Sequence, residues 1–586
     1  MKRSVLKRIF FFALVAADEW GKGIWMRKSE ATEALKSRAY ALFEEFRSAC
    51  SNEWQRLEHA EWMYCGDHWH DVPQVDPNEP RPVTPVIQST VENIAADLMD
   101  ALPEAVITPE TPEDARAARV VEALIRENHD AACYEREYRR MVHDLLVGGY
   151  CVQEVGYDPA LNSGLGGAFI RHTDNRGILF DPLCTDIQDG RAVFKFALRT
   201  REWLSSRFPD YDGSADGYSG YPVAEDAHIT GDKSKTALLI EYWWREYDAT
   251  AGTCRVHMAQ LAGGKVLTDS RELKPEGYYA HGQYPFFVTP LFPRKGSPLG
   301  LGLVDLFEGQ QRYADKLDQI ILKNALMASH NKLLITEASG FDPDDLRDWA
   351  KDVHKGESLG GVSWFATPPL PAYILQYTRN MHESIKEESG ANDFSRGGTA
   401  GGITAASAIA ALQEMSGKRA RMASRQLHES YRDAVRMEIE VEREFNLLPR
   451  VVSFTENGEA QREVFDGKLL AKPLPDGRVL PIEFAISIKV QKENRWSVLS
   501  HNELILQMVQ LKMLTPEQAV ELMHFEGKEQ ILRAAREANA AQENRALPQG
   551  MPVNSLQNQP VPQMEPVQEK TVRRLFAPRR RTSESK

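Results

Sequence analysis

The residues best suited to metal chemistry lie close together between positions 65 and 71. Three possible zinc ligands stand there with two carboxylates beside them: Cys65, His68, His70, Asp67 and Asp71. A zinc site needs a second ligand pair or a fourth ligand at a defined spacing, and the sequence has neither such a pair nor an HExxH motif. Trp62, Tyr64 and Trp69 interleave the group. We therefore predict a packed helix end rich in aromatic residues, and no metal site.

Motifs for nucleotide hydrolysis and for nucleophilic catalysis are missing from the sequence. There is no GxxxxGK[ST] motif, and Lys418 after Gly417 lacks both the upstream glycine and the hydroxyl residue. The stretch 164–167 is a lone Gly-rich segment, which favours a hairpin loop over a phosphate site. No GxSxG motif occurs, and the acid pairs at 344–345 and 387–388 are typical of solvated helix edges. The sequence predicts a protein that is not an enzyme and has no cofactor.

Length and charge restrict the class of protein further. The chain has 586 residues, and single cores stop growing at roughly 250 to 300 residues, so we expect several domains. The formal net charge of −13 argues against a broad surface for nucleic acid, so any DNA contact must be local or weak. The six cysteines have no CxxC spacing, which indicates a reduced intracellular protein.

The N-terminus has the outline of a signal peptide, because four basic residues precede the apolar run 9–17. That run is far shorter than the roughly 20 residues needed to span a bilayer. The alternative is that Met26 is the true start and that residues 1–25 are a leader or an upstream extension. We expect no membrane segment.

Apolar spacing divides the first half of the chain into a helical part and a strand-rich part. Helices are predicted over 29–67 (as one helix or a helical pair), around 87–98, over 111–129 with Thr111 as N-cap, and up to Gly148. From Tyr150 to Phe292, short runs bounded by Gly, Asp and Asn predict strands at 150–157, 168–172, 193–198, 238–244 and 254–261, with Gly263-Gly264 as a hairpin turn. The predicted fold class is multidomain α+β.

The second half contains an unusual order of elements. A helix over 303–327 places Leu306, Tyr313, Leu317, Ile320 and Asn324 on one face and Glu308, Gln311, Arg312, Asp315, Gln319 and Lys323 on the opposite stripe. A small unit follows, with strand 332–336, helix 343–353 and strand 362–365, and it is too short to build its own core. Then come a helix over 379–388, a break at Ser389-Gly390, a Gly-rich loop, and a long helix from Thr404 to Phe445.

The last part of the chain is simpler. Alternating apolar residues predict a strand over 482–490. Two or three helices follow, one of them capped by Thr515-Pro516-Glu517-Gln518. From about residue 542 the composition is rich in Gln, Pro and Asn and ends in arginines, which is typical of a disordered tail.

Two stretches carry a resemblance to a known family. Tyr284–Pro290, Gly300–Asp305 and Gln310-Gln311 are similar to the entry to the stem in portal proteins of short-tailed double-stranded DNA phages. Ser389–Asn392 followed by Gly401–Glu414 resembles the tunnel-loop region of that family, which combines a glycine, a small or hydroxyl residue and an Ala-Ile pair. Less sharply, the resemblance extends from Asn52 to Gly527.

The resemblance implies a ring subunit, commonly one of twelve copies, with wing, stem, clip and crown around an axial channel. After the leader 1–25, it assigns the wing to 26–150 (helical), 151–295 (β-rich), 405–446 (long helix) and 447–494 (β segment), the stem helices to 296–329 and 376–391, the clip to 330–375, the tunnel loop to 392–404, a helical crown to 495–541, and the disordered tail to 542–586. Larger relatives carry a long helical barrel after the crown, whereas this chain ends in the Pro/Gln tail.

The resemblance also implies which residues face DNA. The tunnel loop would line the narrowest part of the channel with Asn392, Ser395, Arg396, Gly397, Gly398, Thr399, Gly401, Gly402, Ile403 and Thr404, and the stem would present Lys323, Arg379 and Lys386. A channel for sliding DNA must not grip it, because each neutralised phosphate adds affinity. An acidic protein with isolated cations suits that task, although each of these cations can equally be a solvated helix residue.

The implied partners are those of a packaging machine. They are further copies of the chain, double-stranded DNA in the channel, the terminase large subunit, head-to-tail adaptor proteins, and the major capsid and scaffold proteins, with no membrane. The implied location is the capsid portal vertex of the virion, after assembly in the host cytoplasm. The tail arginines could also contact scaffold or packaged DNA, or be merely solvated.

Two rival hypotheses remain open on the sequence. The protein could be another structural component of a phage head or tail, such as a minor capsid protein. It could also be a metal-dependent enzyme that uses Cys65, His68 and His70.

Overall fold

The computed structural model describes fourteen stretches of the chain, and they divide between two compact units, Met1–Glu493 and Asn494–Lys586. The described residues are 22–74, 76–100, 102–214, 235–248, 253–329, 332–347, 351–365, 368–390, 418–446, 449–456, 459–473, 479–490, 495–511 and 513–523. The predicted leader, tunnel loop and Pro/Gln tail lie outside them, apart from the end of the leader from Lys22.

Five long helices belong to the body of the first unit. They are α2 (Lys22–Tyr64), α3 (Val86–Met99), α4 (Ala115–Ala132), α5 (Tyr134–Val147) and α14 (Lys418–Phe445). The prediction of helices in these places is confirmed, and the region 29–67 forms one helix. Thr111 holds the predicted N-cap position, but of the 3-10 turn Pro112–Asp114 that leads into α4, and its hydroxyl donates to Asp114 Oδ2 (2.6 Å) without a capping bond to a backbone N–H. Residues 404–417 of the predicted long helix lie outside the described residues.

Two antiparallel sheets contain the predicted strands. One has the order β4-β5-β6-β7-β8, with β4 (Ile178–Phe180), β5 (Ala192–Thr200), β6 (Thr236–Asp248), β7 (Thr253–Ala262) and β8 (Lys265–Asp269). The other has the order β3-β2-β9, with β2 (Tyr150–Asp158), β3 (Gly167–Thr173) and β9 (Phe286–Pro290). The stretch 164–167 closes the β2–β3 hairpin and Gly263-Gly264 closes the β7–β8 hairpin, as predicted.

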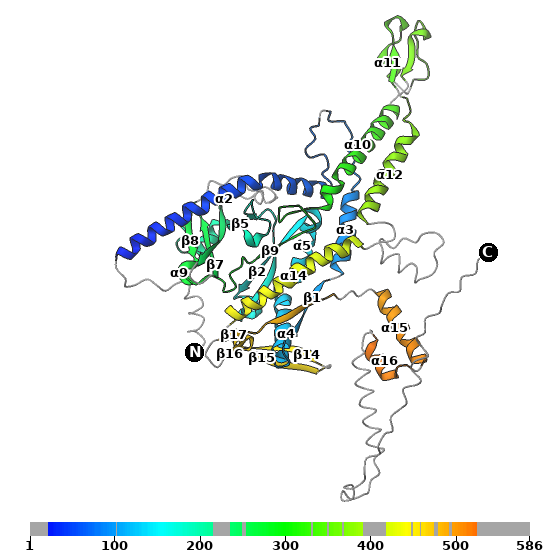
Figure 1. The fold of residues 1–586 in the computed structure, drawn as a ribbon. Coiled ribbons are helices and arrows are strands. Elements are labelled where there is room, and N and C mark those ends of the chain that lie inside the picture. Colours follow the sequence, from blue (N-terminus) through cyan, green and yellow to red (C-terminus); the bar gives the residue numbers. More distant parts are fainter. Residues whose placement is uncertain are drawn as a thin grey trace, which may run out of the picture. The chain divides into compact units, whose positions relative to one another are not determined.

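The helix α2 lies along the five-stranded sheet (Figure 1), and aromatic side chains hold it there. Phe43 and Phe46 are completely buried there, and each ring meets the edge of Phe194, at 5.4 Å and 5.6 Å between centroids. Phe43 also meets Phe196 at 5.6 Å. Because α2 continues past this sheet to Tyr64, the same contacts position its C-terminal half.

Three further strand pairs complete the body of this unit. The strand β1 (Pro103–Pro109) pairs with β18 (Phe484–Val490), which falls within the predicted strand 482–490. Two further hairpins pair β14 (Arg450–Glu456) with β15 (Glu459–Phe465), and β16 (Ala471–Pro473) with β17 (Val479–Pro481). The short elements are α6 (Leu161–Gly164), α7 (Arg201–Arg207), α9 (Ser270–Leu273), η2 (Ile187–Asp189), η6 (Gly467–Leu470), β10 (Phe292–Pro293) and β11 (Gly300–Leu301).

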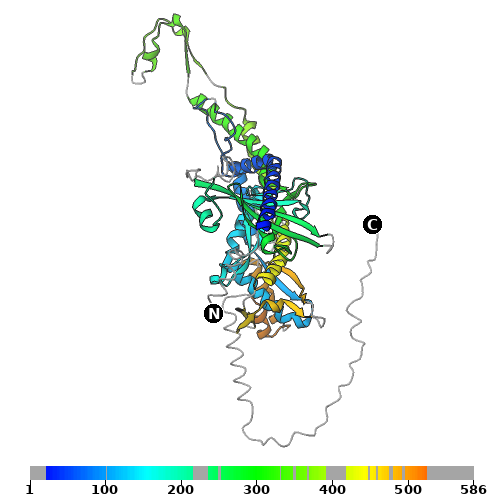
Figure 2. The ribbon, with the colours of Figure 1, turned by 90° about the vertical axis from the view of Figure 1, so that its left-hand side faces the viewer.

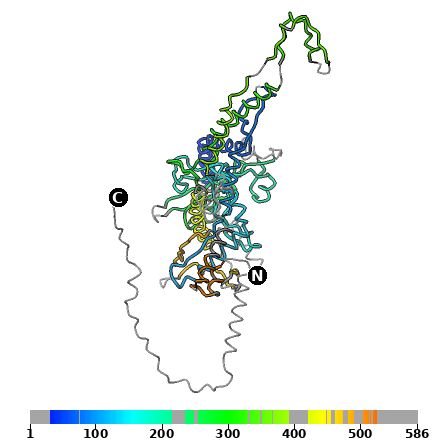
Figure 3. Tube along the Cα trace, turned by 90° about the vertical axis from the view of Figure 1, so that its right-hand side faces the viewer, coloured from blue at the N-terminus to red at the C-terminus, as the bar shows by residue number. Residues whose placement is uncertain are grey.

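A long helical hairpin leaves this body (Figures 1 and 2). The helix α10 (Leu303–Ser329) packs along α12 (Ala372–Ser389), which begins four residues before the expected stem helix 376–391. Between them lies the small unit, with β12 (Lys332–Ile335), η4 (Glu337–Ser339), α11 (Pro343–Arg347), η5 (Leu359–Gly361) and β13 (Val362–Phe365). The predicted helix to Val353 is too long, because residues 351–353 are not helical. Figure 3 traces the same hairpin from the opposite side.

The described part of the second unit contains two helices, α15 (Arg495–Gln510) and α16 (Pro516–Leu522). The predicted cap is confirmed: the Thr515 hydroxyl accepts from Gln518 N (3.3 Å), and the Gln518 side chain accepts from Thr515 N (3.1 Å).

The aromatic contact between α2 and the sheet makes a stability prediction. Phe43→Ala should lower the free energy of unfolding by about 3–5 kcal/mol, because it empties a fully buried site. Leu183→Ala is the control, since that side chain is 83% exposed, and should change stability by less than about 0.5 kcal/mol. Urea unfolding followed by tryptophan fluorescence measures both, and equal effects would contradict the packing described.

Candidate functional site: the root and the faces of the long hairpin

The first turn of α10 is wedged against the turn between α5 and β2. Gly149 has a positive φ of 86°, and a Cβ placed on it would lie 2.4 Å from Gly302 N. A Cβ on Gly300 would lie 2.5 Å from Gly149 O, and one on Gly302 would lie 2.3 Å from Val147 O. The two backbones therefore meet without side chains between them, which only glycine permits.

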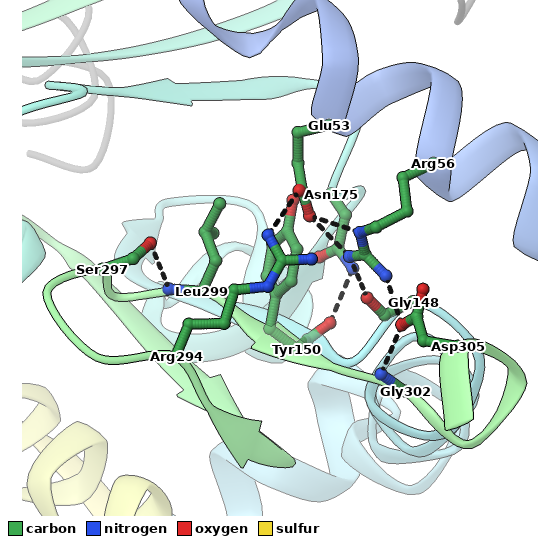
Figure 4. Close-up of polar contacts among 10 residues, drawn as sticks. All are labelled: Glu53, Arg56, Gly148, Tyr150, Asn175, Arg294, Ser297, Leu299, Gly302 and Asp305. Atoms are coloured by element: carbon green, nitrogen blue, oxygen red, sulfur yellow. Dashed lines mark hydrogen bonds and ion pairs between the residues drawn. The ribbon is translucent and has the colours of Figure 1, made fainter.

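An arginine of α2 ties this crossing together (Figure 4). The Arg56 guanidinium donates to Asp305 Oδ2 (2.5 Å), to Glu53 Oε1 (2.5 Å) and to Gly148 O (2.7 Å). Asp305 in turn accepts from Gly302 N (2.7 Å), so it also satisfies a free amide at the start of α10. One side chain thus connects α2, the end of α5 and the start of α10.

Glu53 shares its carboxylate between two cations. Its second oxygen accepts from Arg294 Nη1 (3.0 Å), which comes from the turn between β10 and β11. Burial alone would lower the pKa of Arg56, but the bonds to Glu53 and Asp305 outweigh it and raise that pKa. The guanidinium therefore stays charged, and its fork can hold three acceptors at once.

Two neutral contacts brace the same junction (Figure 4). The Asn175 amide donates to Tyr150 O (2.6 Å) at the start of β2, and Ser297 Oγ accepts from Leu299 N (3.2 Å) in the turn before β11. These bonds fix the two loops on either side of the charged cluster.

Beyond its first turn, the polar stripe of α10 contacts the end of α2 and the turn after it. His59 Nε2 contacts Glu308 Oε1 (2.8 Å), and Arg312 Nη2 contacts Asp71 Oδ2 (2.9 Å). The hydrogen bond from Arg312 is the main cause that lowers the pKa of Asp71. Both contacts join the end of α2 and the turn after it to α10.

The middle of this polar stripe is buried. Gln311 and Asp315 are almost completely inaccessible. The Gln311 amide donates to Thr84 O (2.7 Å) and to Asp315 Oδ1 (3.0 Å), and Asp315 Oδ2 contacts His68 Nδ1 (2.6 Å). His68 Nε2 lies 3.0 Å from Met63 O. A buried polar cluster of this kind is stable only while each member keeps its partners.

The stripe ends in three further contacts. Thr84 Oγ1 donates to Asp318 Oδ2 (3.1 Å), the Gln319 amide donates to Pro80 O (3.0 Å), and Lys323 Nζ contacts Glu79 Oε1 (3.2 Å). We call the whole set, from the Arg56–Asp305 pair to the Lys323–Glu79 pair, the polar zipper. It attaches about five turns of α10 to residues 53–84.

Within the described part of the chain, an apolar stripe of α10 is largely exposed. Leu306, Tyr313, Ile320 and Met327 recur at intervals of seven residues, and their side chains are 40 to 65% exposed. Of the predicted apolar stripe, Leu306, Tyr313 and Ile320 face outward, whereas Leu317 and Asn324 are half-buried, and most of the predicted polar stripe packs inside. The first turns of α10 also bury apolar side chains, Leu303, Val304 and Phe307, but further along the helix the buried face is largely polar.

The predicted DNA-facing residues have different surroundings. Lys323 belongs to the polar zipper through its contact with Glu79. On α12, Arg379 is exposed and Lys386, about two turns later, is half-buried. Neither has a carboxylate partner within the described residues. Asn392, Ser395, Arg396, Gly397, Gly398, Thr399, Gly401, Gly402, Ile403 and Thr404 lie outside the described residues.

The residues considered for a metal site are not brought together. His68 is buried against Asp315, His70 stacks on Trp62 (3.7 Å between centroids), and Cys65 is exposed. Among the described residues, no group of three His, Cys, Asp or Glu side chains could hold a metal ion. No helix in the described part of the chain is long and apolar enough to cross a membrane.

Sequence reasoning missed the residues that anchor the hairpin. Arg56, Glu53 and Asp305 look like ordinary solvated charges in a helical pattern. The bonds Arg56–Asp305 and Glu53–Arg294 join residues 249 and 241 positions apart in the chain. The one available signal was the group of glycines at 148–149 and 300–302, which indicates close backbone approach.

The sequence matches two protein-family models. Residues 41–295 match the phage P22-like portal protein family, and residues 171–462 match the phage SU10 portal protein family. The two ranges overlap and together cover most of the chain. No curated protein matches the sequence.

The charged cluster at the root predicts a large effect for Arg56. Arg56→Ala leaves Asp305 without its arginine and Glu53 with Arg294 alone, and should cost about 3–5 kcal/mol of unfolding free energy. Arg139→Ala is the control, because Arg139 forms only an exposed pair with Glu135, and should cost less than about 1 kcal/mol. Urea unfolding measures both, and a cost for Arg56 no larger than the control would refute the cluster's role.

The close approach of the two backbones at Gly149 predicts a second destabilising substitution. Gly164 has nearly the same backbone angle, so it serves as the control that measures backbone strain alone. Gly164 has φ of 87° and nothing within 4 Å of its Cβ position, whereas the Gly149 site is filled. Gly164→Ala should cost about 1–2 kcal/mol from backbone strain alone. Gly149→Ala should cost at least about 2 kcal/mol more, because backbone atoms must move. Thermal unfolding compares them, and equal costs would rule out the crossing.

Proposed function

The chain belongs to the phage portal proteins of the short-tailed type, and on that premise we propose that twelve copies form a closed ring at one vertex of the capsid. The ring is the channel for genome packaging and ejection and the docking site for the terminase large subunit and later for head-to-tail adaptor proteins. It also contacts the major capsid and scaffold proteins. It assembles in the host cytoplasm and remains in the virion. The role is structural, with no catalytic step.

The observation that carries this proposal is the exposed apolar stripe of α10. Its four side chains at a seven-residue interval form a line of the kind along which a second helix packs. The opposite side of α10 is already occupied by the polar zipper, and α12 covers part of the rest. The same chain cannot cover the stripe with these elements, so a neighbouring copy is the natural partner.

Further exposed apolar side chains lie on α12 and in the small unit. They are Tyr373, Leu375 and Tyr377 on α12, and Leu334, Val353 and Trp364 in the small unit. Exposed apolar side chains that gather in one region often mark a contact with another protein. Contacts between copies would bury it, and they would give the small unit the core that it lacks.

The roles of the parts follow from the family. We propose that the body of the first unit is the wing, that α10 and α12 are the stem, that the unit between them is the clip, and that α15 and α16 belong to the crown. Residues 392–404 would line the narrowest part of the channel. Terminase and adaptors would dock on the clip, because it lies farthest along the hairpin (Figure 1).

Electrostatics is consistent with a channel through which DNA slides. The net charge of −13 prevents strong general attraction to phosphate. Arg379 and Lys386, which no described carboxylate neutralises, would each make a weak contact with the passing backbone. A few isolated cations can contact the duplex without adding enough affinity to slow its sliding.

The ring is tested by the mass and the negative-stain shape of the purified full-length protein. We expect a closed ring near twelve times 66.2 kDa, with an axial hole wide enough for a duplex. A stable monomer at all protein and salt concentrations would refute the proposal.

The stripe is tested by placing a charge in it. Ile320→Glu should raise the protein concentration needed for assembly at least about tenfold, because burying an unpaired carboxylate costs several kcal/mol. Leu183→Glu makes the same apolar-to-acid change at a loop position that is 83% exposed, and should assemble normally. Mass photometry over a dilution series measures both, and unchanged assembly of Ile320→Glu would exclude the stripe as an interface.

A further inference from the structure

A groove of about 980 Å³ runs between α14 and the outer edge of β9. One wall is a continuous stripe of α14, which includes Gln426, Glu429, Asp433, Arg436 and Glu440. At about 1.5 Å per residue, this wall is about 21 Å long. The other wall includes residues 287–290 of β9, and residues 185–188 close one side.

The edge of β9 that faces this groove has unused backbone groups. Val155 N donates to Pro285 O (2.9 Å) and Leu291 N donates to Gly149 O (2.8 Å), so the odd-numbered residues of this segment bond to β2 and its continuation. The N–H and C=O of Val288 therefore point away from β2. Within the described residues, nothing bonds to them.

Side-chain amides close the two ends of this edge. The Gln188 amide donates to Phe286 O (3.2 Å), and the Gln426 amide, in the orientation that satisfies both its atoms, donates to Pro290 O (3.1 Å). The open segment is therefore centred on Val288. Such an edge is a template for an added strand.

The groove also offers a hydrogen-bond donor and negative charge. His281 Nδ1 accepts from Gln283 N (3.1 Å), while its Nε2 is buried and has no partner in the described structure. Burial lowers the pKa of His281 to about 4, so the ring is neutral at pH 7 and Nε2 carries the hydrogen. Asp186 and Glu429 have no cationic partner among the described residues, whereas Asp433 contacts Arg436 (3.1 Å).

We propose that the segment Lys570–Phe576 of this chain's own C-terminal tail docks in this groove as a strand beside β9. The segment has three cations in seven residues, no proline, and the β-favouring residues Val572 and Phe576. Extended, it is about 23 Å long, which matches the groove wall. Its cations complement the uncompensated carboxylates, and its backbone pairs with Val288.

The proposal does not depend on the assembly of a ring. The 46 residues between Met523 and Lys570 can extend to about 150 Å, so the tail can reach a groove of its own subunit or of a neighbour. In both cases the groove and its occupant are the same.

The test is hydrogen exchange, followed by mass spectrometry, of the peptide that contains Val288 in the full-length protein. In Val572→Pro/Leu575→Pro, all charges remain but the segment cannot pair as a strand. We expect the Val288 amide to exchange at least about tenfold faster in this variant than in wild type. Peptides from β2 serve as the internal reference and should not change.

A second variant changes the groove side. Glu429→Lys should also expose the Val288 amide, whereas Glu383→Lys, the same exposed charge reversal on α12 outside the groove, should not. An amide equally unprotected in wild type and in the proline variant would overturn the proposal. So would protection that survives the proline substitutions, because a different occupant would then cover the edge.

Discussion

The polar zipper between α10 and residues 53–84 is the contact on which the rest of the structure depends. It begins with the three bonds of Arg56 at the root and continues through the buried Gln311–Asp315–His68 cluster. These groups are satisfied only when α10 lies in one rotational setting about its axis, since a rotation would leave buried carboxylates and amides without partners. The glycine crossing at 149 and 302 fixes the position of its first turn.

This rotational setting determines which face of α10 is exposed to solvent. Because the polar stripe packs inside, the stripe of Leu306, Tyr313, Ile320 and Met327 faces outward along the hairpin. An isolated chain would leave this surface in water, at a cost of roughly 25 cal/mol per Å² of apolar area. In a closed ring, each copy presents the same surface to a neighbour, so one geometric constraint inside the subunit prepares the contact between subunits.

Much of the fold could be predicted from the sequence, because local periodicity decides it. The helices at 86–99 and 134–147, the strands of both main sheets, the capped helix at Thr515 and the division of α10 into two stripes follow from spacing and turn residues. Which of the two stripes packs inside could not be predicted. The partners of Asp315 and Arg312 are His68 and Asp71, about 240 positions earlier in the chain. The pairing of β1 with β18 is equally remote. Thr111 holds the predicted N-cap position, but its hydroxyl donates to Asp114 and makes no capping bond. The predicted tunnel loop lies outside the described residues, so its role stays a prediction.

The most direct measurement of the central claim is hydroxyl-radical footprinting of the wild-type protein, read by mass spectrometry at Tyr313 and Met327, in the assembled state and in dilute dissociated subunits. Tyr247, on the strand β6 and 68% exposed, serves as the reference side chain. If a neighbouring copy covers the apolar stripe, oxidation of Tyr313 and Met327 relative to Tyr247 should fall severalfold on assembly. If assembled particles form while both residues stay as reactive as in the free subunit, the stripe is not the contact between copies. The explanation of why this stripe is exposed on the subunit would then be wrong.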